Sequence, residues 1–245
     1  MALMYHGFSI GRASHDPYDL HVDVAAFEDQ LLRLLARGWT ALDLNGYLGW
    51  RPGERPGFLI TIDDGFESAL ELAVPVLTRL ELPSVIYLPA GLLGGTSRWL
   101  AKQPDVPIMS ADRIAELSDM RMEVGGHGWD HQDMTSLTAD ELRQHTSGVR
   151  ERLHELAGYA PRTFAYPFGW HDSAARNAVR TAGHELAFSV YDDAGPMAVS
   201  RSDVKPDDTW ATLRWKLIPG YRRIWRAAGA AKPLRAALRR ATQRH

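Results

Sequence analysis

The sequence predicts an α/β fold in which helices cover the outer side of a parallel sheet. Short runs of apolar and β-branched residues, each of strand length, alternate with segments whose apolar residues recur at helical spacing. The chain has 245 residues, of which 45% are hydrophobic, and this is enough to fill the core of a large domain. The alternation alone leaves open whether the sheet is open or closed into a barrel.

The first part of the chain shows this alternation clearly. Apolar residues at helical spacing predict a helix over 24–37, and Gly38 follows it as a residue suited to a left-handed stop. Strands are predicted next at 57–63 and 83–89, and a helix is predicted between them at 67–80. Pro75 should start, bend or split that helix, because proline lacks the backbone N–H that a helix interior requires.

The second part continues the same order. Ser110 is expected to cap a helix, and Thr138 with Glu141 forms the sequence pattern of a capping box. The predicted helices are 110–120, 138–156 and 173–183, and the predicted strands are 122–127, 163–167 and, as the last strand, 186–190.

The composition limits the chemistry that is available. The chain contains no cysteine, so disulfides and thiolate metal sites are excluded, and histidine, aspartate and glutamate remain as strong metal ligands. The N-terminus lacks the pattern of a secretory leader, and no run of about 18 apolar residues occurs. These features predict a cytoplasmic protein.

Polar residues follow three of the predicted strands at the point where each strand ends. Asp63 and Asp64 follow the first, His127 and His131 follow the second, and the segment 166–170, YPFGW, follows the third. Functional groups of barrels of this kind collect at the carboxyl ends of the strands, because the loops there converge on one face.

These residue types suit a hydrolytic metal centre. Two histidines four residues apart can face one cation, and a carboxylate from a neighbouring strand completes a three-ligand site with open positions. If one aspartate binds the cation, the adjacent one can stay ionised as a base. Taken alone, Asp-Asp-Gly is commonly a turn and a pair of histidines is common on surfaces, so the prediction depends on the three strand ends together.

The segments TIDDG (61–65), HGWDH (127–131) and FAYPFGW (164–170) resemble the first three motifs of the polysaccharide deacetylase family, carbohydrate esterase family 4, also known as the NodB homology domain. The resemblance implies a distorted, seven-stranded relative of the TIM barrel, here over residues 1–212. It implies that Asp63 is the general base, and that Asp64, His127 and His131 hold a divalent ion, most often Zn²⁺, with Co²⁺, Ni²⁺ or Mn²⁺ as alternatives.

The sequence departs from the family pattern at two points. Many members carry an arginine that orients the base where this chain has Ala165, and Arg162 lies three residues earlier. No Leu-x-x-His motif for the general acid follows the last predicted strand. The segment MYHGFS (4–9) resembles the N-terminal Tyr-His strand of poly-N-acetylglucosamine deacetylases, which makes His6 the candidate acid; a packing role for His6 is the alternative. A contribution from 201–204, RSDV, stays open.

The implied reaction is hydrolysis of an N-acetyl group of an N-acetylhexosamine in a glycan, a lipid-linked sugar or a glycoside. The backbone N–H of Phe168 is the candidate donor to the oxyanion, since Pro167 has none. The candidate substrate-binding residues are Tyr166, Pro167, Gly169 and Trp170. Stacking on a sugar is expected of Trp170, while for Tyr166 a core position is an equal alternative.

Two other function classes stay open. Related enzymes with this scaffold act on amides or imides that are not sugars. A binding module without catalysis is disfavoured by the complete Asp-Asp and His-x-x-x-His sets. The sequence does not indicate an oligomeric state.

The C-terminal segment, residues 213–245, is predicted to be a basic helical tail. It holds ten Lys/Arg and no acidic residue, which leaves 18 basic and all 30 acidic residues in 1–212. Aromatic and aliphatic residues lie among the arginines, namely Trp215, Leu217, Ile218, Tyr221, Ile224 and Trp225. This composition is typical of helices on anionic membrane surfaces, which would make the protein peripheral to the membrane, and a helix docked on the barrel is the alternative. Nucleic acid is not expected, since no binding motif accompanies the charge.

Overall fold

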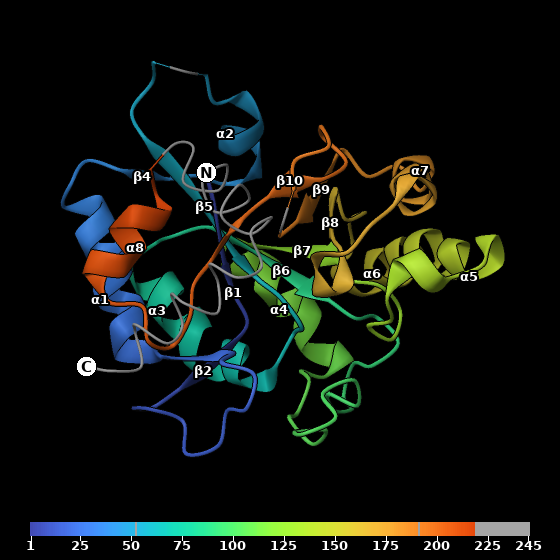
Figure 1. Cartoon of the computed structure of the whole chain (residues 1–245), viewed down its shortest axis with the longest axis horizontal. Coiled ribbons are helices and arrows are strands. Elements are labelled where there is room, and N and C mark those ends of the chain that lie inside the picture. The colour runs from blue at the N-terminus through green and yellow to red at the C-terminus, as the bar shows by residue number, and fades with distance from the viewer. Residues whose placement is uncertain (52, 191, 219–245) are drawn as a thin grey trace, which may run out of the picture. The chain divides into compact units, whose positions relative to one another are not determined.

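A parallel sheet forms the centre of the protein. The computed structural model describes residues 1–51, 53–190 and 192–218. Within them, strands pair in the order β10-β9-β8-β7-β6-β5-β1-β11, and every pair along this path is parallel. The bounds are β1 (Ala2–Tyr5), β5 (Gly57–Ile62), β6 (Ser84–Leu88), β7 (Met122–Gly126), β8 (Thr163–Ala165), β9 (Leu186–Ser189), β10 (Val199–Ser200) and β11 (Ser202–Asp203). Helices surround this sheet (Figure 1), and the predicted barrel fold is confirmed.

The sheet is nearly closed into a barrel, and its two edge strands are joined by one residue. Strand β10 pairs with β9 at one edge of the sheet, and β11 pairs with β1 at the other edge. These two short strands are consecutive in the chain, and Arg201 is the single residue between them. Arg201 is only 2% exposed, so the residue that joins the two edge strands is a buried arginine.

Three further strands lie beside this sheet. Strands β2 (Gly7–Ser9) and β3 (His21–Asp23) form a parallel pair directly after β1, and β4 (Thr40–Ala41) pairs with the start of β5. All six residues of β5 are buried. A strand that is covered on both faces is expected to be a continuous apolar run, as β5 is.

The helices of the first compact unit, Met1–Asp207, follow the predicted order, with one short helix, Leu44–Gly49, that was not predicted. They are α1 (Val24–Leu35), α2 (Leu44–Gly49), α3 (Val74–Arg79), α4 (Ile114–Asp119), α5 (Ala139–Arg143), α6 (Val149–Ala157) and α7 (Ser173–Thr181). Short 3₁₀ segments occur at Ala111–Arg113, Met134–Ser136 and Pro167–Gly169, and π-helical segments at Ala69–Ala73 and Gln144–Gly148.

The structure tests the predicted helix signals. Pro75 lies in the first turn of α3, directly after a π-helical segment, so the hydrogen-bond pattern changes next to Pro75 while the helical backbone continues. The capping box of Thr138 and Glu141 is confirmed, with both hydrogen bonds present. Ser110 occupies the predicted N-cap position, but its side chain makes no hydrogen bond to the helix backbone. Instead it hydrogen-bonds to the Asp112 carboxylate and thereby lowers the pKa of that group.

The prediction that residues 186–190 form the last strand is wrong. Strands β10 and β11 follow, and each has two residues. A segment of this length shows no periodicity, and its Ser, Arg and Asp residues are uncommon in strands. Pairing with β9 and β1 therefore determines the extended conformation here, and local propensity does not.

A second compact unit begins at Asp208 and contains α8 (Trp210–Lys216). Trp215 and Ile218 are 55% and 46% exposed. The rest of the predicted tail, 219–245, lies outside the described residues, and the predicted boundary after residue 212 stays a prediction. Among the described residues, no helix has both the length and the apolarity needed to cross a bilayer.

Candidate active site

The two adjacent aspartates lie at the carboxyl end of β5. Asp63 and Asp64 are each 3% exposed, and Asp64 has a left-handed backbone with φ of 71°. Gly65 follows with φ of 62°, and a Cβ atom there would lie 2.6 Å from the Leu88 side chain. Glycine is therefore required directly after the aspartates, and the turn sends their side chains to different partners.

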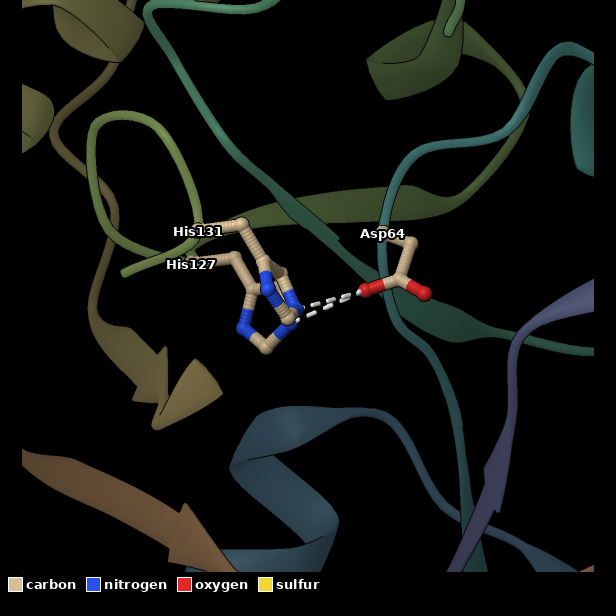
Figure 2. Close-up of side chains that lie close together, drawn as sticks. All are labelled: Asp64, His127 and His131. Carbon is tan, nitrogen blue, oxygen red and sulfur yellow. Dashed lines mark hydrogen bonds and ion pairs between the residues drawn. The ribbon is translucent and has the colours of Figure 1, made fainter. Parts of the chain in front are cut away.

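Asp64 is close to both histidines of the HGWDH segment. Its Oδ1 atom lies 3.2 Å from Nε2 of His127 and 3.1 Å from Nε2 of His131. The two rings approach the carboxylate from the same side (Figure 2). All three side chains are at most 5% exposed, so a buried cluster of one oxygen and two nitrogen ligands exists at the end of the barrel.

Backbone strain coincides with this cluster. His131 has φ of 60°, and Phe168, in the neighbouring loop, has φ of 58°. Together with Asp64, these are three non-glycine residues of the site in a conformation that costs about 1 kcal/mol or more each. The surrounding structure maintains this strain, and side chains from three different loops thereby contact one another, Asp64 and Phe168 both through His131.

The cluster fits a divalent metal ion. Its ligand atoms lie within 4.8 Å of one another, close enough for one cation to contact all three. Two imidazoles with one carboxylate suit zinc and other late first-row metals, and three protein ligands leave open positions for water and substrate. Burial alone would raise the pKa of Asp64. Hydrogen bonds from both histidines outweigh this effect and hold the pKa of Asp64 well below its usual value.

Asp63 has a different partner. Arg201 donates two hydrogen bonds to its carboxylate, at 2.7 Å from Nη1 to Oδ1 and 2.6 Å from Nη2 to Oδ2. Burial alone would raise the pKa of Asp63, but the adjacent guanidinium lowers it below the ordinary value. Asp63 is therefore an ionised, oriented carboxylate next to the metal-ligand cluster.

Arg201 is itself held firmly. Its Nη1 also donates to Thr61 Oγ1 at 3.0 Å, and its Nε donates to the Ser189 carbonyl at 3.4 Å. The rings of Tyr87 and Phe188 lie 5.6 and 5.5 Å from the guanidinium carbon. Ala165, where the family resemblance leads one to expect an arginine, cannot pair with Asp63, and Arg201 between β10 and β11 does so instead. Arg162 instead forms an ion pair with Glu185 near the surface.

The structure places His6 next to the aspartates. Tyr5 and Ile62 are register partners in the adjacent strands β1 and β5. His6 and Asp63 directly follow these two residues, so they lie at the same end of the two strands. The charge of His6 contributes to lowering the pKa of both Asp63 and Asp64. A role as general acid stays a prediction, as does the resemblance of 4–9 to a Tyr-His strand.

Two exposed aromatic side chains border the cluster. Phe168 is 38% exposed and contacts the His131 ring edge to face, with ring centroids 4.6 Å apart. Trp170 is 48% exposed, and its ring lies 5.1 Å from that of Phe168. The backbone N–H of Phe168 has no hydrogen-bond partner within residues 1–51, 53–190 and 192–218. The role of this N–H as the donor to an oxyanion stays a prediction.

The prediction that Tyr166 offers a ring face to the substrate is wrong. Tyr166 is 1% exposed, its ring packs in a core cluster, and its hydroxyl donates to the Met197 carbonyl at 2.9 Å. Pro167 and Gly169 are also buried, and they shape the turn that carries Phe168 and Trp170. Their contact with substrate stays a prediction.

A parallel barrel that brings three buried metal-ligand side chains next to an arginine-paired carboxylate has the architecture of a hydrolytic enzyme. Comparison with known families identifies the class. The family model described as polysaccharide deacetylase matches residues 51–187, more than half of the chain. The chain belongs to the polysaccharide deacetylase family.

Individual relatives are distant. YxkH of Bacillus subtilis (strain 168), which carries a provisional polysaccharide deacetylase name, is 21% identical over 83% of this chain and 71% of its own. The structure of the Streptococcus pyogenes deacetylase PplD in complex with acetate matches with a TM-score of 0.73 at 16% identity, over 89% of this chain and 97% of that one. IcaB from Ammonifex degensii matches with a TM-score of 0.70 at 23% identity, over the same shares. These structural likenesses establish the fold.

Proposed function

We propose that this protein hydrolyses the N-acetyl group of an N-acetylhexosamine in a glycan, a lipid-linked sugar or a glycoside, with a divalent metal ion held by Asp64, His127 and His131. The observation that carries the proposal is the pairing of Asp63 with Arg201 directly beside the buried ligand cluster. Family membership supports a sugar substrate with an acetyl group.

Each group of the chain has a distinct part in this reaction. A bound divalent cation, most often zinc in such ligand sets, supplies Lewis acidity toward the acetyl carbonyl and toward water. Asp63 accepts a proton from the attacking water, because Arg201 keeps its carboxylate ionised and oriented. The Phe168 N–H donates to the oxyanion, and His6 protonates the departing amine. The products are acetate and the free amino sugar.

The substrate is proposed to lie across the exposed face of Trp170. This indole is nearly half exposed and adjoins Phe168, and a flat ring of this kind packs well against the apolar face of a pyranose. Trp170 packs on Phe168, and Phe168 packs on the proposed ligand His131. A sugar stacked on the indole can therefore present its acetamido group to the ligand cluster.

An acetate-release screen tests this function. Chelator-stripped protein is supplied with Zn²⁺, Co²⁺, Ni²⁺ or Mn²⁺ and incubated with N-acetylated sugars, sugar nucleotides, lipid-linked glycans and non-sugar amides and imides. We expect metal-dependent acetate release from an N-acetylhexosamine substrate and none from the Asp64→Ala variant. Hydrolysis of non-sugar amides or imides alone would contradict the proposal.

We also propose that the basic C-terminal segment contacts an anionic membrane surface on the cytoplasmic side. The exposed Trp215 and Ile218 and the ten basic residues of 213–245 support this. Sedimentation of the full chain with anionic vesicles, compared with a variant in which Arg222, Arg223 and Arg226 are changed to Gln, tests it. Equal binding by both proteins would contradict the proposal.

A further inference from the structure

The two proposed metal-ligand histidines are held in different ways. The Nδ1 atom of His127 lies 2.7 Å from the carbonyl oxygen of Ala165, which orients its ring through a hydrogen bond. The Nδ1 atom of His131 is buried and has no hydrogen-bond partner among the described residues. Histidines that bind metals usually donate a hydrogen bond from the other ring nitrogen, and this bond fixes the ring orientation. Another feature must therefore orient His131.

Aromatic packing provides this orientation. The ring of Trp99 is stacked on His131, with centroids 4.2 Å apart and planes 14° from parallel. Phe66 is stacked on Trp99 in turn, at 6.1 Å and 8°, and His21 on Phe66, at 5.8 Å and 14°. These four nearly parallel rings, His21, Phe66, Trp99 and His131, form one ring column.

The loop that carries Trp99 is itself well ordered by internal contacts. Ser97 is completely buried, and its hydroxyl donates to the Gln103 carbonyl at 2.7 Å and accepts from the Val106 N–H at 3.1 Å. The same loop pairs with the segment after the aspartates through a bridge between Phe66 and Ile108. These contacts fix the loop, and they thereby hold the Trp99 ring against His131.

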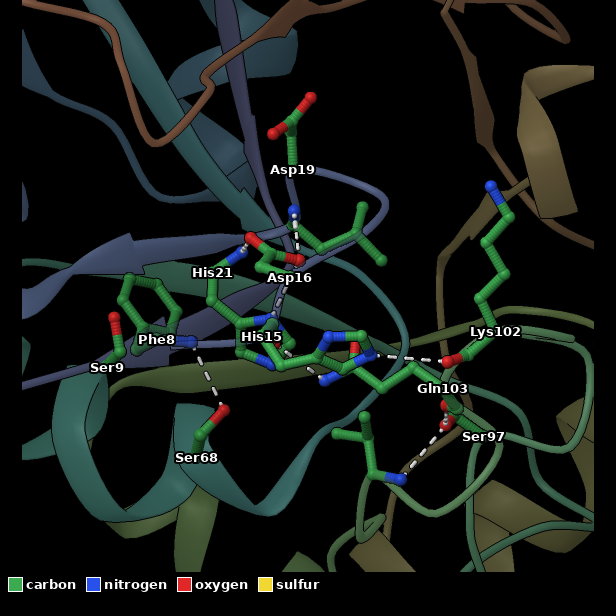
Figure 3. Close-up of polar contacts among 12 residues, drawn as sticks. Phe8, Ser9, His15, Asp16, Asp19, His21, Ser68, Ser97, Lys102 and Gln103 are labelled. Carbon is green, nitrogen blue, oxygen red and sulfur yellow. Dashed lines mark hydrogen bonds and ion pairs between the residues drawn. The ribbon is translucent and has the colours of Figure 1, made fainter. Parts of the chain in front are cut away.

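The far end of the ring column is fixed by a carboxylate. Asp16 accepts hydrogen bonds from the backbone N–H groups of Leu20 and His21, and its Oδ1 lies 3.2 Å from Nδ1 of His21 (Figure 3). A Cβ atom at position 7 would lie 2.5 Å from the His21 ring, so Gly7 is required for the ring to lie there.

Contacts between two loops complete this support. The Lys102 N–H donates to the Tyr18 hydroxyl at 2.9 Å. The Gln103 side chain donates to the His15 carbonyl at 3.3 Å (Figure 3). The N-terminal loop that holds His21 and the loop that holds Trp99 are thus joined to each other by hydrogen bonds as well as by the ring column.

We propose that Trp99, backed by Phe66 and His21, is a positioning residue that orients His131 for metal binding in place of a hydrogen bond. The inference rests on the proposed metal centre. Because the flat indole covers one face of the imidazole and Phe168 contacts the ring from another direction, the Nε2 atom is kept toward Asp64.

Metal affinity tests the inference without any sugar substrate. Zn²⁺ binding to chelator-stripped full-length protein is measured by competition with a chromophoric chelator, and the Co²⁺ absorption spectrum reports the ligand geometry. We expect Trp99→Ala to weaken Zn²⁺ binding about 10- to 100-fold, the range found when support of a metal ligand is lost, and to change the Co²⁺ spectrum. Trp99→Phe, which keeps a flat ring, should remain within about threefold of the wild type, since ring stacking is retained.

Two further variants make the result decisive. Trp99→Leu keeps apolar volume in the loop and removes the flat face, so it should weaken Zn²⁺ binding as Trp99→Ala does while the circular dichroism spectrum stays native. Trp50→Ala, a tryptophan whose N–H bonds to the Arg55 carbonyl, is the matched control and should bind Zn²⁺ as the wild type does. Wild-type Zn²⁺ affinity in folded Trp99→Leu or Trp99→Ala would overturn the inference. Weakened Zn²⁺ binding in a protein that releases no acetate would support it and refute the proposed function.

Discussion

The two sides of the candidate active site are built from different interactions. On the sheet side, Asp63, Arg201 and His127 lie on or directly after strands, and buried hydrogen bonds fix each of them. On the loop side, His131 and Phe168 lie in left-handed turns and are held by ring contacts. The sheet side is therefore held by directional hydrogen bonds, and the loop side is held by ring packing.

This difference suggests a division of tasks. Hydrogen-bonded charges on rigid strands suit proton transfer, which is sensitive to small changes in distance. Stacked rings on loops tolerate small movements and present an apolar face, which suits substrate contact and ligand support. Substitution of Asp63 or Arg201 on the sheet side should therefore impair catalysis, and substitution of the rings on the loop side should impair binding of metal or sugar.

The largest expected effect is on the sheet side, at the proposed base. Asp63→Asn keeps the shape of the side chain but cannot accept a proton, so kcat should fall about 10³-fold, within the usual range for loss of a general base. Zn²⁺ affinity should stay at the wild-type level. Steady-state kinetics and chelator competition measure the two quantities, and Asp105→Asn, at an exposed aspartate, is the control. Full activity in Asp63→Asn would refute the base assignment.

The next effect concerns the partner of the base. Arg201→Met leaves Asp63 as a buried, unpaired carboxylate, so the free energy of unfolding should fall by about 3–5 kcal/mol. The double variant Asp63→Asn/Arg201→Met should recover much of this loss, since the amide carries no charge. Urea denaturation of the four proteins of this cycle measures the coupling. Additive effects of the two substitutions would show that the Asp63–Arg201 ion pair does not stabilise the fold.

A smaller effect is expected on the loop side. Trp170→Ala removes an exposed ring, so KM for a sugar substrate should rise about 5- to 30-fold, which corresponds to about 1–2 kcal/mol of stacking. Because the indole does not contact the ligand cluster directly, kcat and Zn²⁺ affinity should change little. The same kinetics on Trp50→Ala provide the comparison. A loss confined to kcat would place Trp170 in catalysis and break the division between the two sides.

The effect that is smallest at neutral pH lies outside the candidate site, next to the amino end of β9. His184, before β9, is 4% exposed, neither ring nitrogen has a partner among the described residues, and burial lowers its pKa from 6.5 to about 3. The folded protein therefore binds fewer protons than the unfolded chain between these values, and stability falls as pH falls through this window. His184→Leu should remove this decline and gain about 2 kcal/mol relative to the wild type between pH 7 and 5.

Thermal unfolding at pH 7, 6 and 5 measures the effect at His184. The exposed His154 provides a control, since His154→Leu should change stability equally at each pH. If the stability of His184→Leu fell between pH 7 and 5 as much as that of the wild type, this buried histidine would not be the source of the loss of stability in acid.

The sequence was informative where local patterns carry the information. The apolar run of β5 followed by Asp-Asp-Gly, and the four-residue spacing of His127 and His131, predicted the strand ends that meet in the site. Tertiary contacts determined the rest. Arg201 is a single residue between two short polar strands, and nothing in RSDV shows that pairing with β9 and β1 buries its side chain. Trp99 lies in a long loop, where no periodicity indicates that it stacks on His131.

Acetate release as a function of the zinc-to-protein ratio tests the central claim most directly. Chelator-stripped wild type, Asp63→Asn and Asp64→Ala are titrated with Zn²⁺ in the presence of the best N-acetylhexosamine substrate. The account predicts that wild-type activity rises from near zero and saturates at about one equivalent of zinc, while Asp63→Asn binds that equivalent without turnover and Asp64→Ala does neither. Acetate release that is independent of zinc, or that persists in Asp64→Ala, would contradict it.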